Sequence, residues 1–383
     1  YEAGVLEVFA GLVEKGVVYR DLKPVHWSID NQTALAEAEL EYYEREDTSV
    51  FVKFDAQAPA EGAPDTTALM IWTTTPWTLP ANLAVAVHPR YDYGIYDVEG
   101  RPTVIACELA GKVLAMKGLE AEEPSYVFKG QDLVGLEYDL PFQRGVGKVA
   151  AAEYVTLDDG TGLVHTAPGH GAEDYQTGLC EGLDVYCPVR ADGTYDDTVP
   201  DWLRGESIWK ANDMVVERLR ESGHLFHDQK FLHSYPHDWR GKKPIIFRAT
   251  EQWFVGVDRP VYGGASMRDA ALEQTAEDVD FLPGWGRNRM RGMLESRPDW
   301  CISRQRSWGL PIPAFFKKDG TPVLNPDSVR AVARVFAEKG SDAWFYMSPE
   351  DLLVHYEEEG LDKSTLTKGK DTFDVWFESG SLW

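Results

Sequence analysis

An abrupt change in residue pattern near Asp47 constrains the fold of this chain more than any other feature. From there to about residue 235, short segments rich in β-branched and aromatic residues follow one another, among them SVFVKFDA, ALMIWTTT, LAVAVHP and YGIYDVEG, and Gly, Pro or Asp separates them. Short segments bounded by turn residues are typical of strands. We therefore expect a β-barrel or mixed β domain over residues 48–235, with helices inside it at 171–181 and 206–222.

The segments on either side favour helices mixed with strands. Residues 1–18 have apolar positions at helical spacing, and residues 33–45 (TALAEAELEYYER) are rich in good helix formers, so we predict a helix in each. Thr33 would lie near the N-cap of the second helix.

Beyond residue 236, short apolar strands in PIIFRAT and DWCISR alternate with predicted helices at 267–276 and 326–339. A β domain between such segments is the pattern of an insertion into a sheet domain. We expect three parts, namely residues 1–47, 48–235 and 236–383.

Length and composition set outer limits on the class of protein. The chain has 383 residues, enough for two or three domains, and four cysteines that form no CxxC pair. Because it starts with Tyr1 and stops just past a motif that normally continues, we interpret it as a piece of a longer protein. It has neither a signal segment nor an apolar run near 18 residues, so we expect a soluble, cytoplasmic protein without a membrane partner.

The charge is strongly acidic but uneven. The formal net charge is −25, which disfavours nucleic acid binding, yet six arginines stand between Arg287 and Arg306. Charge alone favours a solvated surface there over an RNA-binding one. Composition therefore leaves RNA binding open.

The first motif runs from Trp72 to Asn82 (WTTTPWTLPAN) and follows the apolar segment ALMI. Its four threonines and one asparagine offer many neutral donors and acceptors at a strand end. Such a rim suits a ribose, an ester and a water molecule. An ordinary Thr-rich strand followed by a turn is the simpler interpretation, and composition alone favours it.

The second motif runs from Asp159 to Tyr175 (DGTGLVHTAPGHGAEDY). Its glycines permit close backbone approach to a ligand, and Asp174 would lie in the first turn of the following helix. There it either interacts only with the helix dipole or accepts a charge-assisted bond from a substrate ammonium. His165 is either a satisfied core imidazole or a residue that positions an ester. Neither motif has the spacing of a metal site or of a nucleophile paired with a base.

Three further motifs are rich in aromatic and charged residues: SYPHDWR at 234–240, RPDWCISRQRSWGLPIP at 297–313 and FDVWFESG at 373–380. His237 and Asp238 could be metal ligands, but no second pair accompanies them, so a structural role is favoured. Taken singly, none of these motifs indicates a function.

Together the five motifs resemble isoleucyl-tRNA synthetase, a class I aminoacyl-tRNA synthetase in which an editing (CP1) domain is inserted into a Rossmann-type catalytic core. The valyl and leucyl relatives carry TTRP where this chain has Thr74-Thr75-Pro76-Trp77, and Pro-Ala-His where it has Pro168-Gly169-His170. Both departures are those of the isoleucyl enzyme. The resemblance implies an α/β fold with an inserted mixed β-barrel, and it covers the whole chain.

The resemblance also implies what this chain lacks. No HIGH-like and no KMSKS-like segment occurs, and these are the family's ATP-binding loops. We therefore expect no activation of isoleucine here; ATP and Mg serve the full-length parent enzyme, and editing needs no cofactor. Relatives often carry zinc-binding cysteines where this chain has Ser28 and Asp238, so we predict no metal.

Carried over residue by residue, the resemblance gives a candidate editing site. Asp174 would hold the substrate α-amino group, and His165 would form the pocket wall that limits side-chain size. The candidate catalytic residues are Asp174, Thr75 and His165, the candidate substrate-binding residues are Trp72, Thr73, Thr74, Thr78, Asn82 and His170, and Trp308, Trp376 and Glu378 mark an incomplete synthetic site.

The implied activity is hydrolysis of the ester of mischarged valyl-tRNA(Ile) by a positioned water molecule. The partner would be the acceptor end of tRNA(Ile) carrying valine, and we expect a monomer. Two alternatives stay open: an editing domain of a valyl or leucyl type, and a tRNA-binding module without hydrolytic activity.

Overall fold

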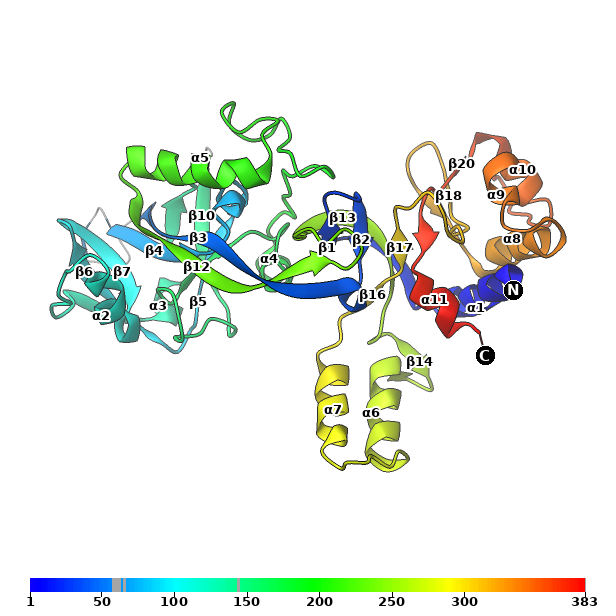
Figure 1. Cartoon of the computed structure of the whole chain (residues 1–383), viewed down its shortest axis with the longest axis horizontal. Helices are drawn as coiled ribbons and strands as arrows, with labels where there is room; N and C mark the ends of the chain where they lie inside the picture. The colour runs from blue at the N-terminus through cyan, green and yellow to red at the C-terminus, as the bar shows by residue number, and fades with distance from the viewer. Residues whose placement is uncertain (57–62, 65–66, 143–144, 383) are drawn as a thin grey trace. The chain divides into compact units, whose positions relative to one another are not determined.

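The computed structural model describes residues 1–56, 63–64, 67–142 and 145–382 (Figure 1). Contacts divide the chain into two compact units. Unit 1 comprises Tyr1–Leu22, Thr33–Ala38 and Glu251–Trp383, and unit 2 comprises Lys23–Gln32 and Glu39–Thr250. The chain passes from one unit to the other within strand β1 (Val18–Ser28) and again within strand β13 (Ile246–Val255).

Unit 2 is built on one large sheet. Its strand order is β12-β3-β9-β10-β5-β11-β4-β7-β6-β8, and an additional pairing of β3 with β4 closes a ring of six strands, β3, β9, β10, β5, β11 and β4. The strands are β3 (Leu40–Ala56), β4 (Thr67–Thr73), β5 (Ala84–Val87), β6 (Asp92–Val98), β7 (Arg101–Ala106), β8 (Tyr126–Lys129), β9 (Glu137–Asp139), β10 (Val146–Ala151), β11 (Leu163–Thr166) and β12 (Leu225–Asp238). Since β5 is buried along its whole length and β4 nearly so, the ring encloses apolar side chains.

Several helices accompany this sheet, and two of them lie where the sequence predicts helices. Helix α4 (Ala172–Glu181) and helix α5 (Ile208–Glu221) confirm the predictions for 171–181 and 206–222. Figure 1 shows α5, in green, lying along the strands, and one face of it is buried through Ile208, Ala211, Val215 and Leu219. Helices α2 (Cys107–Ala115) and α3 (Gly130–Leu133) and the short 3-10 helix η2 (Pro76–Ala81) complete the unit.

The predicted helix over residues 33–45 is wrong. Strand β2 (Thr33–Leu35), the turn η1 (Glu37–Glu39) and the first part of β3 occupy this segment. Strand β3 pairs with β12 from Leu40 to Val52, and the exposed Tyr42 and Tyr43 belong to this ladder. Intrinsic helix propensity amounts to less than about 1 kcal/mol per residue, and the long cross-strand pairing overrides it.

Unit 1 has a separate apolar core around α1 (Glu2–Glu14) and α8 (Pro326–Lys339). Phe9 of α1 packs edge-on against Phe373 with ring centroids 4.8 Å apart. These helices and α6 (Met267–Glu277) confirm the predictions for 1–18, 326–339 and 267–276. Helix α7 (Gly286–Glu295), which the sequence analysis did not predict, lies beside α6, and neither helix buries a residue.

The remaining elements of unit 1 are short. They are β14 (Pro260–Tyr262), β15 (Ala265–Ser266), β16 (Trp300–Cys301), β17 (Ser303–Arg304), β18 (Phe315–Phe316), β19 (Pro322–Val323), β20 (Thr367–Lys368), β21 (Thr372–Phe373), α9 (Ala343–Tyr346), α10 (Pro349–Leu352), η3 (Lys363–Thr365) and α11 (Val375–Gly380). No helix in the described residues is long and apolar enough to cross a membrane.

Candidate functional site

One cavity in unit 2 collects residues from both the first and the second motif. Its volume is about 430 Å³, within the range of small-molecule sites. It is lined by Trp72, Thr73, Thr74, Thr75, Thr78, Tyr154, Val155, Thr156, Asp158, Asp159, Gly160, Thr161, Gly162, Leu163, Val164, His165, His170 and Asp174. None of these lining residues is Lys or Arg, so the described wall favours a cationic ligand group over an anionic one.

Strand pairing explains why two distant motifs meet here. β4 and β11 are parallel neighbours with Trp72 opposite Val164, so the ends of the two strands bring the threonines beside His165. After β4 the chain turns at Thr75, whose backbone carbonyl accepts a 2.9 Å bond from the Thr78 amide. Pro76 starts the short helix η2, where a missing N–H is harmless.

The threonine hydroxyls form a connected row. Thr73 Oγ1 and Thr75 Oγ1 are 3.2 Å apart, and so are Thr75 Oγ1 and Thr78 Oγ1. The Thr75 amide donates to Thr73 Oγ1 at 3.1 Å, and the Thr78 hydroxyl donates to the Thr75 carbonyl at 2.8 Å. The row is therefore a preorganised neutral surface rather than a set of mobile hydroxyls.

His165 is held at both ring nitrogens. Asn82 Nδ2 lies 2.7 Å from His165 Nδ1 and also donates to the Ala84 carbonyl at 2.9 Å, while Tyr138 donates to Asn82 Oδ1 at 2.6 Å. These contacts fix the amide orientation, so Asn82 donates and His165 Nδ1 accepts. The proton is then on Nε2, which donates to the Thr78 hydroxyl at 2.9 Å.

Electrostatics keep this imidazole neutral. Burial, together with the nearby His170, lowers the pKa of His165 to about 3. A neutral ring with both nitrogens engaged is a rigid wall element. Asn82 does not line the cavity and acts on it through His165.

Asp174 lies in the first turn of α4, as the sequence predicts. One carboxylate oxygen, Oδ2, accepts a 2.8 Å bond from the Ala167 amide in the preceding loop. Burial raises the pKa of Asp174 to about 6, although the Ala167 amide opposes the shift. Glu173 is exposed. Asp174 is therefore the acid of α4 that lines the cavity.

The loop before α4 is fastened to strand β13. The Ala249 amide donates to the Gly169 carbonyl at 2.8 Å, and His170 Nδ1 lies 3.0 Å from the Phe247 carbonyl. A side chain at Gly169 would meet the Tyr186 carbonyl oxygen at 2.2 Å, so the loop needs glycine for close packing. The sequence analysis missed Phe247, Tyr138 and Tyr154 as members of this site, because none of them belongs to the motifs' Thr, His or Asp pattern.

The chain resembles known proteins along its whole length. The family of tRNA synthetases class I (I, L, M and V) matches residues 1–383. Isoleucine–tRNA ligase of Lactobacillus acidophilus is 42% identical over 386 residues, covering 100% of this chain and 41% of the relative. The ligase of Aquifex pyrophilus is 41% identical, covering 99% of this chain and 74% of the relative. The chain belongs to the isoleucine–tRNA ligases of class I.

This chain spans only part of most of its isoleucine–tRNA ligase relatives. The enzyme of Laribacter hongkongensis is 44% identical, and the match covers 99% of this chain but 40% of that enzyme. A solved structure, "The crystal structure of GlLeuRS-CP1", matches 47% of this chain and 99% of its own with 17% identity and a TM-score of 0.39. We draw nothing from a likeness at that level.

Residues of the synthetic-site motifs lie in unit 1. Trp308 is 86% exposed and Trp376 is 51% exposed, and Glu378 belongs to α11. None of the three lines the cavity of unit 2.

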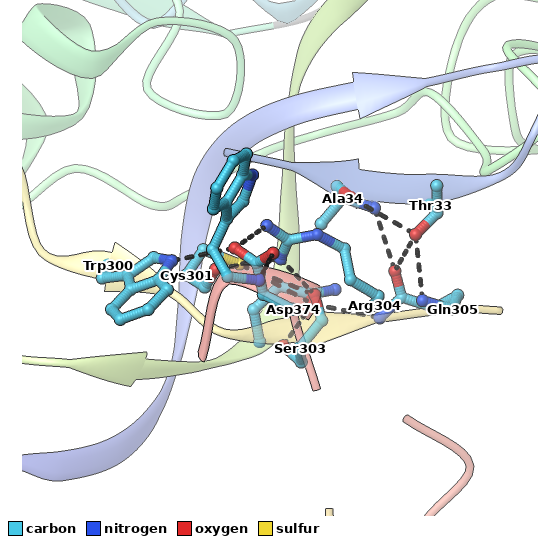
Figure 2. A network of polar contacts seen from close by, with 10 residues as sticks. Thr33, Ala34, Trp300, Cys301, Ser303, Arg304, Gln305 and Asp374 are labelled. Carbon is cyan, nitrogen blue, oxygen red and sulfur yellow. Dashed lines mark hydrogen bonds and ion pairs between the residues drawn. The ribbon is translucent and has the colours of Figure 1, made fainter. Parts of the chain in front are cut away.

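A buried ion pair joins the motif at residues 297–313 to the motif at residues 373–380. Arg304 Nη2 lies 2.7 Å from Asp374 Oδ2, and both side chains are fully buried. Figure 2 shows the Asp374 carboxylate between the Arg304 guanidinium and the indole of Trp300, which donates at 3.0 Å. Asp374 Oδ1 also accepts from the Trp376 amide at the start of α11. These contacts assign Arg304 and Asp374 to holding unit 1 together.

Ser28 and Asp238, where the resemblance led us to expect no metal, belong to a hydrogen-bonded cluster. Ser28 Oγ and Asn31 Nδ2 donate to Asp238 Oδ2 at 2.7 and 2.6 Å, and the Arg240 amide donates to Oδ1 at 2.8 Å. Burial raises the pKa of Asp238, but these bonds outweigh it and the net pKa lies below its usual range. Among the described residues no three His, Cys, Asp or Glu side chains are grouped as metal ligands.

Proposed function

We propose that the cavity of unit 2 hydrolyses the ester bond of mischarged valyl-tRNA(Ile). The observation that carries the proposal is that the Asp174 carboxylate and a row of threonine hydroxyls line one cavity, whose described wall has no Lys or Arg. An aminoacyl ester presents a free α-ammonium, which Asp174 would bind through a charge-assisted bond. The terminal ribose and the ester would lie along Thr73, Thr74 and Thr75.

The chemistry would follow from positioning. A water molecule attacks the ester carbonyl, and the neighbouring ribose hydroxyl and neutral donors of the threonine row stabilise the oxyanion. Trp72 and Thr78 contribute to the walls. No Ser or Cys side chain lines the described cavity, so we propose direct hydrolysis without an acyl-enzyme.

Selectivity would come from the size of the cavity. One missing methylene in an apolar pocket is worth only about 1–3 kcal/mol, a generalisation drawn in part from the isoleucine enzymes themselves. A second cavity that admits valine and excludes isoleucine adds a further step of discrimination. His165, fixed by Asn82 and Thr78, would set the limit on side-chain size.

Deacylation of three substrates by the chain tests the proposal. Valyl-tRNA(Ile) should be hydrolysed well above the spontaneous rate, and isoleucyl-tRNA(Ile) should be spared. Preferred hydrolysis of threonyl-tRNA would indicate a valyl-type editing site. Binding of tRNA without hydrolysis of any of the three would indicate a binding module and overturn the proposal.

For the parent enzyme we propose ligation of isoleucine to tRNA(Ile) with ATP and Mg. In that enzyme, residues 1–47 and 236–383 would belong to a Rossmann-type catalytic core, and residues 48–235 would form the editing domain inserted into it. The family's ATP-binding loops have no counterpart in this sequence, and the described residues offer no carboxylate group arranged for Mg. The residues present therefore do not fit ATP. We further propose a cytoplasmic monomer whose partner is the tRNA acceptor end.

A further inference from the structure

The two histidines of the cavity are bonded in opposite ways. His165 accepts at Nδ1 and donates at Nε2, so neither nitrogen is available to a ligand. His170 Nδ1 faces the Phe247 carbonyl, which has no proton to donate, so His170 Nδ1 must donate. In the neutral ring, the lone pair of His170 is then on Nε2.

That second nitrogen of His170 is buried, and no hydrogen bond of ordinary geometry reaches it from the described residues, although the Cys187 side chain interacts with the imidazole. A buried polar atom without a partner costs about 1–3 kcal/mol, and such atoms gather where a ligand or water is bound. A second unpartnered atom, Trp72 Nε1, belongs to a residue that lines the same cavity. The concentration of unsatisfied groups at one cavity points to a polar ligand.

The ring of His170 is firmly oriented. The His170 amide donates to the Ala167 carbonyl at 2.8 Å, which fixes the backbone of the turn. Trp77 packs against the imidazole, with ring centroids 5.1 Å apart, and fixes the ring. The Nδ1–H···O=C bond selects the tautomer. A fixed imidazole with its lone pair on a defined side is the arrangement a general base needs.

We propose that His170 is the general base of the editing reaction, an inference that rests on the proposed function and assigns its proton transfer. As the water oxygen bonds to the ester carbonyl carbon, one water proton passes to His170 Nε2. When the tetrahedral intermediate collapses, the bond between the carbonyl carbon and the ribose oxygen breaks, and the imidazolium returns that proton to the ribose oxygen. Valine and the free 3′ end of the tRNA are released, and His170 is neutral again.

The charged neighbours of His170 suit this role. Burial lowers the pKa of His170, but Cys187, the Phe247 carbonyl and Asp174 raise it, so that the net pKa lies above the ordinary value. His165 stays neutral. Burial raises the pKa of the Cys187 thiol, but the neighbouring His170 and, to a smaller extent, the Val189 carbonyl and Arg248 lower it to about 7. A base whose pKa lies near the working pH transfers protons most efficiently.

The His170→Asn variant separates proton transfer from structure. The asparagine amide can still donate to the Phe247 carbonyl from near the Nδ1 position, whereas no basic nitrogen remains at Nε2. We expect the rate constant for hydrolysis of bound valyl-tRNA to fall at least about 100-fold, the lower end for a lost general base. The affinity for a non-hydrolysable valyl-adenosine amide should change less than threefold.

The pH profile gives a second readout. Because Asp174 and His170 must both lose a proton, kcat/KM should rise about 100-fold per pH unit below both pKa values, and His170→Asn should reduce this to about 10-fold. Cys187→Ala is the matched control, since it removes a neighbouring thiol outside the cavity lining. Cys187→Ala should keep the rate of hydrolysis, and the part of the pH profile that depends on His170 should shift to lower pH.

Three outcomes would overturn the inference: an unchanged rate in His170→Asn, a loss of rate matched by a loss of affinity for the amide, or full rescue by His170→Gln, which can place a water molecule but cannot accept its proton. Each leaves the proposed function intact. Failure of the proposed function is distinct, because the unaltered chain would then not hydrolyse valyl-tRNA at all.

Discussion

At the scale of single residues, the proposed function makes Asp174 the group whose ionisation should control binding of the substrate ammonium. Burial raises its pKa to about 6, so the carboxylate is charged above this pH and neutral below it. Its contribution to kcat/KM for valyl-tRNA should therefore be present above pH 6 and be lost as the pH falls through 6. Asp174→Asn should remove this limb.

The size of the Asp174 effect follows from a buried charge-assisted contact. Asp174→Ala should cost about 2–4 kcal/mol of transition-state binding. The exposed Glu173→Ala is the control and should leave the rate within a factor of about 2–3, the range of a surface substitution. Wild-type deacylation by Asp174→Ala would remove Asp174 from the ammonium site.

His165 should set the upper size limit. His165→Ala removes a ring held by Asn82 and Thr78, and the enlarged cavity should then admit isoleucine. Deacylation of isoleucyl-tRNA(Ile), which the unaltered chain should not catalyse, is the expected gain. Continued protection of isoleucyl-tRNA would show that His165 does not form the limiting wall.

Tyr138 supports His165 from outside the cavity. Tyr138→Phe leaves the buried oxygen of Asn82 without its donor, which should lower the free energy of unfolding by about 1–3 kcal/mol and loosen His165. ¹⁵N chemical shifts of His165 would report a mixture of tautomers. The control is Tyr235→Phe, because its hydroxyl bonds to the Ile245 carbonyl instead; an unaltered His165 spectrum in Tyr138→Phe would contradict the assignment.

At the scale of elements, the loop from Pro168 to Gly171 determines where His170 and Asp174 point. Gly169→Ala would bring a methyl group within 2.2 Å of the Tyr186 carbonyl oxygen, so the loop must shift. Misplacement of catalytic groups by about 1 Å can cost roughly 100-fold in rate. We expect a deacylation loss of that order.

The matched control for Gly169→Ala is Gly182→Ala at the end of α4. Gly182 has φ +66° and open space around it, so alanine there should cost about 1–2 kcal/mol of stability through its backbone conformation alone. Deacylation should stay near the wild-type rate. Equal rates in the two variants would show that the position of the loop does not matter.

The elements also show what the sequence could predict. The sequence correctly predicted α1, α4, α5, α6 and α8. Of these, α1, α5 and α8 each bury an apolar face, whereas α6 buries no residue and begins at the Ser266 cap. The prediction failed for residues 33–45, since β3 pairs with β12, a strand far away in the sequence; Tyr43 and its partner Tyr235 are 192 residues apart. Local propensity carries no information about that partner.

For the candidate site, too, the sequence predicts what lies within a motif but not what a distant segment contributes. The Thr row, His165 and Asp174 stand in two compact motifs, and the structure brings them to one cavity. Two residues far from the motifs fix the tautomers of these histidines: Tyr138 acts on His165 through Asn82, and the Phe247 carbonyl contacts His170 directly. No spacing within either motif could have identified those two residues.

At the scale of the whole molecule, the site depends on segments outside residues 48–235. Trp27 donates to the Ala191 carbonyl at 2.8 Å, and Arg248 donates to the Val189 carbonyl at 2.7 Å. Phe247 and Ala249 hold the loop that carries His170. All of these contacts lie within unit 2, which extends to Thr250.

A fragment of residues 23–250 should therefore be more stable and hydrolyse the ester faster than a fragment of residues 48–235. The shorter fragment loses the first part of β3, the end of β12 and the carbonyl that fixes the His170 tautomer, so it should unfold at lower denaturant concentration and hydrolyse a valyl ester of adenosine at least 10-fold more slowly. This small substrate removes any difference in tRNA contact. If residues 48–235 matched the longer fragment in both measurements, the contacts of Trp27 and Phe247 would have no part in the site.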